Sequence, residues 1–421
     1  MEDFPTISYK VELRLNGKLI GDCRKIAESL TWTKRCTKMG VDAISFTVND
    51  FVFSEWCEER GVSLVDILKP LALDCRIVRN GITMVGGYLA TMPAYQPTGH
   101  SASLSLQFDG YLNYLAGVFI YPQATETKRM GAMIADWISE ANTRSGDAGK
   151  SFGFSSIRID SLPTVTQSYE DYKDIKSYIT DRCDNVSGAG EFEVYINPQR
   201  EYAIIPESSF GGDRTGDYII NYPAEINIVS AAELSASEVS GFASCVIGIG
   251  NGETSGTEAD NTAIISRQVN EEAVKEYGYA EATLSESSVS IQETLDRNTA
   301  TELAQRSSMI WQPEILLSGR QVTPAPPIHL HYPITSDEPT NYNPNHPIWI
   351  GDTVAIHNRA DFTGMTSGEF RVEELEVAVE ATGAETIRPT LSRIGTSVNN
   401  FSFAQEFVRM QSEIRALKAK K

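Results

Sequence analysis

The sequence lacks the segments that would place the chain in a membrane or direct it to secretion. No stretch in its 421 residues approaches the roughly 18 consecutive apolar residues of a membrane-spanning helix. Its start, Met-Glu-Asp-Phe-Pro, has no basic segment followed by an apolar one, as a secretory signal would. We therefore expect a soluble protein of several domains that is synthesised and folds in the cytosol.

Cysteine and basic residues are also scarce. The six cysteines show no CxxC spacing and predict reduced thiols that are mostly buried. Lys and Arg number 36 against 56 Asp and Glu, which gives a formal net charge of −20. Because phosphate contacts require clustered Lys and Arg, this balance argues against nucleic-acid binding. Hydrophobic residues make up 41 %, a share typical of a globular protein.

Signatures of catalysis are missing as well. The one GxSxG run, Gly149 to Gly153, is not taken as a nucleophile elbow, and no cysteine has a neighbouring histidine in a recognisable protease signature. The glycine-rich run Gly248 to Gly252 lacks both the GKS/T ending and a following helix, so it indicates a strand end that turns into a loop rather than a phosphate-binding loop. Carboxylates are numerous, but the sequence offers no means of choosing a glycosidase pair among them. We predict no enzyme and no cofactor.

The five histidines offer one candidate metal site. His329-Leu330-His331 would place two imidazoles on one face of a strand, and His346 follows not far along the chain. The surrounding prolines favour a surface arm, and neither a cysteine nor an HExxH motif supports a metal. We therefore predict that no metal is bound.

The first part of the chain, residues 1–117, alternates apolar and polar residues as short antiparallel strands do. Tyr9, Val11, Leu13 and Leu15 form one such run, and Asn16-Gly17 then supplies the pair favoured by a two-residue hairpin. Asn80-Gly81 repeats this turn signal, with strand patterns on both sides. The spacing predicts a small β-barrel or sandwich.

Helical spacing appears in residues 118–205, which predict a small α+β domain. Two apolar stripes with helical spacing follow one another along the chain. Two strands come after them, at about 192–196 and 202–205. The stripes are Met133, Ile134, Trp137 and Ile138, then Tyr172, Ile175, Tyr178 and Ile179.

Residues 206–250 and 315–395 predict a second β-barrel domain, interrupted by a loop and helix insertion at 251–314. The insertion's helix is expected at about 291–308 because that stretch contains no Gly or Pro. Residues 313–347 hold eight of the 18 prolines, which excludes regular helix and most central-strand pairing and predicts an extended arm or long loop. The predicted fold class is α+β, mainly β.

Two further surfaces stand out near the end of the chain. Residues 396–421 predict an amphipathic helix, whose apolar stripe either packs on its own domain or joins neighbouring copies. A predicted strand also carries one acidic face, which is either simply solvated or lines a channel. The stripe is Phe403, Phe407, Met410, Ile414 and Leu417, and the acidic face is Glu374, Glu376 and Glu380.

The order of these parts resembles the baseplate or tail hub proteins of tailed phages, and the late-control-type hub proteins of contractile injection systems. The resemblance covers about two thirds of the chain. The residues that carry it are Ser29 to Thr33, Ala43 to Val48, Cys75 to Gly81, Gly86-Gly87-Tyr88, Val246 to Leu317 with its Glu276-Tyr277-Gly278 turn, Ile350 to Val354, and Gly368 to Val372.

The resemblance implies a homotrimer in which two tail-tube-like antiparallel β-barrel domains per subunit build a pseudo-sixfold ring around a channel. Three copies of two similar barrels can mate with a sixfold tail tube or distal tail protein on one side and with a threefold tip, spike or fibre on the other. DNA would pass transiently and without specific contacts along an acidic lumen. The protein would reside in the virion tail after assembly in the host cytoplasm, without inserting into a membrane.

Two other functions remain open at this point. One is a hub-associated tail protein that degrades cell wall, although the chain ends at residue 421 without a lytic or peptidase extension. Release of soluble fragments from peptidoglycan would favour it. The other is a β-sandwich adhesin that binds carbohydrate, which glycan binding together with a monomeric mass would support.

Overall fold

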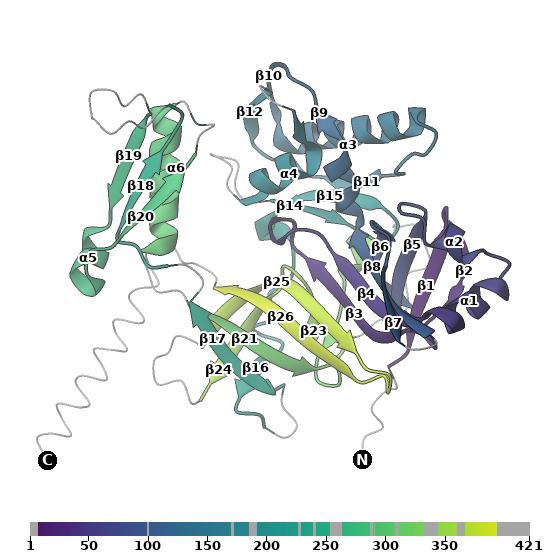
Figure 1. The fold of residues 1–421 in the computed structure, drawn as a ribbon. Coiled ribbons are helices and arrows are strands. Elements are labelled where there is room, and N and C mark those ends of the chain that lie inside the picture. Colours follow the sequence, from purple (N-terminus) through teal and green to yellow (C-terminus); the bar gives the residue numbers. More distant parts are fainter. Residues whose placement is uncertain are drawn as a thin grey trace, which may run out of the picture. The chain divides into compact units, whose positions relative to one another are not determined.

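Antiparallel strands dominate the computed structural model of the chain, so the fold is α+β and mainly β, as predicted. The chain divides into two compact units, each of which makes most of its contacts within itself. Figure 1 shows the chain coloured along its sequence. The first contains Met1–Glu233, Ile315–Val354 and Arg371–Leu391, and the second contains Leu234–Glu314 and Ala355–Phe370. The structure describes residues 7–98, 101–169, 172–184, 192–225, 229–238, 241–252, 263–286, 289, 291–307, 311–331, 344–359 and 367–393.

The N-terminal strand group of the first unit forms where the sequence alternates. Both predicted hairpin turns are present: Asn16 and Gly17 have φ of 49° and 81°, and Asn80 and Gly81 have 48° and 85°. Two successive positive φ values suit the right-handed twist of the flanking strands. The strands are β1 (Tyr9–Leu15), β2 (Lys18–Asp22), β3 (Glu28–Arg35), β4 (Ala43–Asn49), β5 (Leu73–Arg79), β6 (Ile82–Leu89), β7 (Ala94–Thr98) and β8 (Ser101–Gly110).

Short helices complete this group. Asn49 caps the first of them, because its side chain accepts hydrogen bonds from the backbone N–H groups of Phe51 and Val52. The helices are α1 (Asp50–Glu58) and α2 (Leu64–Ile67), with 3₁₀ turns η1 (Thr37–Met39) and η2 (Tyr111–Gly117).

One sheet continues from this group into the C-terminal strands β25 (Gly368–Val379) and β26 (Glu385–Arg393). Its order in the first unit is β26-β25-β3-β4-β8-β6-β5-β1-β2, with β7 attached to β8 (Figure 1). Among the described strands this path does not return on itself, so no sheet closes into a barrel. Strands predicted to belong to two separate barrels thus share one set of backbone hydrogen bonds.

The α+β part of the first unit packs helices on a three-stranded sheet of order β11-β15-β14. Met133, Ile134, Trp137 and Ile138 are buried on one helix, as their spacing predicted. Tyr172, in contrast, precedes the second helix and is 68 % exposed. The elements are β9 (Phe119–Ile120), β10 (Gln123–Arg129), α3 (Met130–Asp147), β11 (Ser155–Ile159), β12 (Thr164–Tyr169), β13 (Lys173–Asp174), α4 (Ile175–Asp184), β14 (Phe192–Ile196), β15 (Glu201–Pro206) and η3 (Glu207–Ser209).

The expectation of an extended arm at 313–347 is wrong for its described residues. Ile315 and Leu317 are buried in a strand, and Val322 and Ala325 are buried after it. Four of the prolines lie where a missing N–H costs little, because Pro324 and Pro347 are in two-residue strands and Pro326 and Pro327 come just before a short helix. The elements of this region are β21 (Trp311–Ser318), β22 (Thr323–Pro324), α7 (Ile328–His331) and β23 (Pro347–Ile348). Outside it, β16 (Ile219–Tyr222) pairs with β24 (Thr353–Asn358).

The second unit has a small sheet of its own, in which β18 pairs antiparallel with β19 and parallel with β20. The helix predicted at about 291–308 is confirmed as α6 (Gln292–Arg306). The glycine-rich run is also as predicted up to Gly252, since β18 ends at Ile249 and a bend follows. The other elements are β17 (Glu233–Glu238), β18 (Cys245–Ile249), β19 (Ile265–Val269), α5 (Glu271–Tyr277) and β20 (Glu281–Ser285).

The cysteines agree with the prediction from their spacing. All six are buried thiols outside any disulfide: Cys23, Cys36, Cys57, Cys75, Cys183 and Cys245. No helix in the described ranges is long and apolar enough to cross a membrane.

Candidate functional site at the junction of β3 and β25

The ladder between β3 and β25 joins strands that lie more than 300 positions apart in the sequence. It pairs six residues of each strand, from Glu374 opposite Arg35 to Val379 opposite Leu30. At its first pair the Arg35 Nε lies 2.5 Å from the Glu374 Oε2. The ladder therefore makes one continuous surface out of the early and late strand groups.

One face of this junction carries the predicted acidic residues. Glu374 and Glu376 alternate with the buried Leu375 and Val377 on β25, and Glu380 is exposed in the turn after the strand. Glu374 has Arg35 as its partner, and Glu376 lies 3.6 Å from Arg388 of β26. Two of the three carboxylates thus have a cation beside them. That this face lines a channel stays a prediction.

Short hydroxyl side chains occupy the same face on the neighbouring strands. Thr33 lies opposite Glu376, and Thr31 lies opposite Ser45 of β4. Small residues therefore follow the charged ones across the strands, and among them Thr33 is buried while Thr31 and Ser45 are half-buried.

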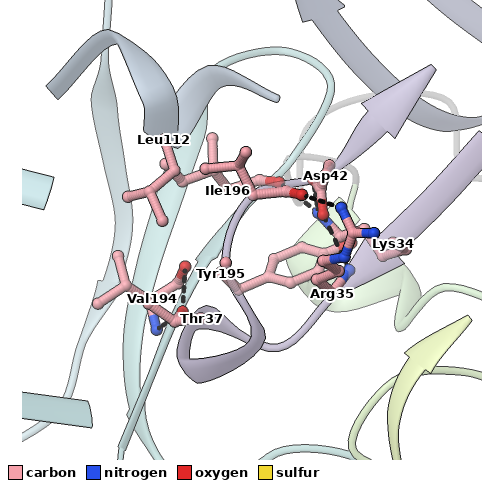
Figure 2. A pocket seen from close by; sticks show the side chains of 10 residues that line it. Lys34, Arg35, Thr37, Asp42, Leu112, Val194, Tyr195 and Ile196 are labelled. Atoms are coloured by element: carbon pink, nitrogen blue, oxygen red, sulfur yellow. Dashed lines mark hydrogen bonds and ion pairs between the residues drawn. The ribbon is translucent and has the colours of Figure 1, made fainter. Parts of the chain in front are cut away.

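Behind the junction, Lys34 is buried on the other face of β3. Its Nζ lies 2.6 Å from the Asp42 Oδ2 and donates to the Ile196 carbonyl at 3.0 Å, and it sits 4.6 Å from the centre of the Tyr195 ring. Figure 2 shows these groups around a small pocket. The cavity measures about 20 Å³, which is space for about one water molecule. This pocket is too small for an organic substrate.

The turn after β3 is held by a buried carboxylate on β14. The Thr37 backbone N–H and hydroxyl both donate to the Glu193 Oε1, each at 2.6 Å. Burial raises the pKa of Glu193 to about 7, and the two bonds from Thr37 oppose this rise only in part. Glu193 therefore ties the α+β part to the junction and titrates near neutral pH.

A second ionic group lies beside this turn. Lys38 is 3.1 Å from the Glu373 carboxylate and 3.3 Å from that of Glu207, and the Arg371 Nε is 2.9 Å from Glu207. Burial lowers the pKa of Lys38, but Glu373 and Glu207 outweigh it and leave the pKa above its ordinary value. These ion pairs therefore link three parts of the first unit, which are the β3–β4 connection, the segment that follows β15, and the strand β25.

The predicted strand with two imidazoles on one face is wrong, because His329 and His331 lie in the short helix α7. His331 is buried, and its Nε2 donates to the Thr83 carbonyl while its Nδ1 accepts from the Tyr195 hydroxyl at 2.8 Å. Burial lowers the pKa of His331 to about 3, so it is a neutral core residue. Within the described ranges no three His, Cys, Asp or Glu side chains are grouped as metal ligands.

Comparisons with known proteins find solved tail proteins with a similar fold. No protein-family model matches the sequence, and no curated protein matches it. The structure is similar to the 43 kDa tail protein of prophage MuSo2 from Shewanella oneidensis, with 12 % identity, a TM-score of 0.57, and 92 % of this chain and 98 % of that chain covered. The chain has the fold of a phage tail protein. A tail protein from Neisseria meningitidis MC58 is similar at 11 % identity and a TM-score of 0.55, again over 92 % and 98 % of the two chains.

Sequence reasoning missed most of the junction of this tail-protein fold. Lys34, Asp42, Glu193 and Glu373 were not singled out, although one signal was present. Glu193 interrupts a strand of otherwise apolar residues, Phe192 to Ile196, all of which are buried. A charged residue in such a strand indicates a buried partner.

The predicted oligomerisation stripe lies outside the described residues. This applies to Phe403, Phe407, Met410, Ile414 and Leu417, and to the whole predicted helix 396–421.

Proposed function

We propose that the chain is a structural tail hub subunit of a tailed phage or phage-like particle, and not an enzyme. Three copies form a ring that connects the tail tube to the tip or spike. The observation that carries this proposal is the likeness to two tail proteins, which extends over 92 % of this chain and nearly the full length of each tail protein. A likeness of that extent takes in nearly all of the chain rather than one common domain.

The junction supports the ring model in a second way. A pseudo-sixfold ring of three subunits requires two similar β-domains per chain, set side by side. The early strand group and the group of β25 and β26 meet along the β3–β25 ladder. We assign the two tube-like domains to these two groups, with the ladder as the contact that fixes their spacing.

The polar face of the junction suits passage of DNA without binding. The carboxylates of Glu374, Glu376 and Glu380 would repel phosphates. Arg35 and Arg388 each lie beside one of them and so limit the repulsion between neighbouring copies in the ring. Thr31 and Ser45, which are half-buried on the same face, offer no cation to a passing phosphate. We therefore propose that this face is turned toward the channel.

The mass and shape of the purified chain test this proposal. A trimer has a mass of about 139 kDa, three times the 46.3 kDa of one chain. Negative-stain images of the particle should show a ring with a central hole and six similar lobes. A monomer that binds glycans, or release of fragments from peptidoglycan, would point instead to the adhesin or the cell-wall-degrading protein.

A further inference from the structure

Three side chains of the first unit form a row of hydrogen bonds that runs from the end of β8 through the η2 turn to the start of α4. The Lys176 Nζ donates to the Asn113 Oδ1 at 3.1 Å, and the Asn113 Nδ2 donates to the Asp109 Oδ2 at 2.7 Å. All three residues are half-buried. An amine therefore faces one end of a carboxamide, and a carboxylate faces the other end.

The backbone fixes the two outer residues of this row. Asp109 lies inside the large sheet, where its strand β8 pairs with β4 on one side and with β6 on the other. Lys176 lies in the first turn of α4. Asp174 caps that turn, because its carboxylate accepts from the N–H of Ser177 at 2.8 Å and from the Ser177 hydroxyl at 2.6 Å. Both residues are thus held by regular structure.

The segments that carry Asn113 and Lys176 are also joined to each other. The strand β9, which follows η2, pairs with β13, which precedes α4. Next to this pair, the Ile175 N–H donates to the Val118 carbonyl at 2.9 Å. Groups held in contact with good geometry react as if one of them were present at about 10⁵ M or more. The fold therefore supplies the proximity that a bond between the two side chains needs.

The chemistry of this row differs from that of an ion pair. A carboxylate beside a lysine favours the ammonium form, whereas the Lys176 Nζ faces a neutral carboxamide. An uncharged amine is a nucleophile, and the carboxamide carbon is a suitable electrophile. Asp109 contacts the nitrogen that would leave, where a carboxyl group can accept and return a proton. The buried Tyr88 lies directly opposite Asp109 on β6 and shields it from water on that side.

We propose that Lys176 and Asn113 form a covalent isopeptide bond within the chain. The Lys176 Nζ, after losing one proton to solvent, attacks the Asn113 Cγ, and the Nζ–Cγ bond forms. Asp109 takes the surplus proton from Nζ and passes it to Nδ2. The Cγ–Nδ2 bond then breaks, ammonia leaves, and a secondary amide remains. An amine and a carboxamide thus become an amide and ammonia, and no atom is oxidised or reduced.

The bond closes a loop of the chain, because its two residues lie 63 positions apart. It joins η2, at the end of the first strand group, to α4 in the α+β part. Like a disulfide, such a link removes conformations from the unfolded chain. The inference does not depend on the proposed ring, so either of them can fail alone.

The mass of the full chain, purified and then denatured, tests the bond. Loss of ammonia should lower the mass by about 17 Da from the value calculated from the sequence. Peptide mapping should find the peptides that contain Asn113 and Lys176 joined to each other. The linked chain should also migrate faster on a denaturing gel than Lys176→Arg, because its loop cannot extend. A chain that keeps the full calculated mass after prolonged incubation at mildly alkaline pH would overturn the inference.

Three variants assign the roles of the side chains. Lys176→Arg should keep the full mass of its sequence, because its guanidinium is not a nucleophile. Asp109→Asn retains both reacting groups, and its linkage should be slower by about 100-fold or more, measured as the joined fraction at equal times after synthesis. Lys69→Arg, at an exposed lysine, should link as the parent does. Linkage of Asp109→Asn at the parent's rate would contradict the proton transfer through Asp109.

One side reaction has the same mass change and must be separated from the bond. An asparagine can lose ammonia by closing on its own backbone, most readily before a glycine, as at Asn16-Gly17. That reaction leaves the peptides of Asn113 and Lys176 separate, and it does not require the lysine. A loss of ammonia that persists in Lys176→Arg, or that occurs without joined peptides, would therefore count against the isopeptide bond.

Discussion

Glu193 on β14 accepts two hydrogen bonds from one residue, Thr37, whose N–H and hydroxyl each lie 2.6 Å from the same carboxylate oxygen. The carboxylate is fully buried, and its pKa is about 7 in place of the ordinary 4.5. Between pH 4.5 and 7 the folded chain therefore binds more protons than the unfolded chain. The contribution of Glu193 to the free energy of unfolding falls as the pH rises through this window.

Glu193→Gln should remove that pH dependence. The stability of the variant relative to the parent is expected to rise by up to about 3 kcal/mol between pH 4.5 and pH 8, because only the parent must bury a charge. Urea unfolding at both pH values measures the change. Glu55→Gln, at an exposed position on α1, is the control and should show the same difference from the parent at both. An unchanged difference for Glu193→Gln would show that the carboxyl is not buried as described.

His331 should shift stability with pH in the opposite direction. Its pKa of about 3 lies below the ordinary 6.5, so the unfolded chain binds more protons as the pH falls from 6.5. The stabilising effect of neutral His331 is thus lost on acidification, by up to about 1.4 kcal/mol per pH unit. His331→Gln should be less stable than the parent at pH 7, and this deficit should shrink by pH 5. Unfolding curves at the two pH values check this, and a constant deficit would contradict it.

Arg79 and Glu385 form a buried ion pair between β5 and β26. Arg79 donates from Nε and from its second terminal nitrogen to the two carboxylate oxygens, at 2.7 and 2.8 Å, and the side chains are 5 % and 0 % exposed. Glu385→Ala leaves an unpaired buried guanidinium and should cost about 3–5 kcal/mol. The double variant Arg79→Met, Glu385→Met should recover most of the loss, as a double-mutant cycle in urea would measure. A double variant as unstable as the single one would contradict this.

Gly248→Ala should weaken the packing of α6 against the sheet that contains β18. The new methyl group would overlap the Thr299 side chain, and overpacking of this kind costs about 1–3 kcal/mol. Hydrogen exchange of β18 and α6 amides should report the loss locally. Adding Thr299→Ala should restore part of the protection, and Gly216→Ala, where a Cβ meets nothing within 4 Å, should have little effect. Equal effects of Gly248→Ala and Gly216→Ala would mean that α6 does not pack there.

Local patterns predicted the elements well. Both hairpin turns, the helix α6 and the buried stripe of α3 follow from residues close together in the sequence, because turn geometry and helical spacing are local properties. The proline-rich region was misjudged. The strand and short helix there are stabilised by burial of Ile315, Leu317 and Leu330 against the rest of the first unit, which no local pattern contains.

The candidate site was predicted only in part. Alternation on β25 correctly separated Glu374 and Glu376 from the buried Leu375 and Val377, since a strand places successive side chains on opposite faces. The cations beside these carboxylates were not predicted. Arg35 meets Glu374 only because two strands more than 300 positions apart happen to pair in that register.

The sequence by itself determined the strand-rich character, the turns, the reduced cysteines and the helices α3, α4 and α6, because each depends on neighbouring residues or on composition. Only the tertiary structure decided that β3 pairs with β25, that Glu193 meets Thr37 and that Arg79 meets Glu385. Such contacts form between segments that are distant in the sequence. They depend on which of these segments can bury apolar surface against each other and at the same time pair their buried charges.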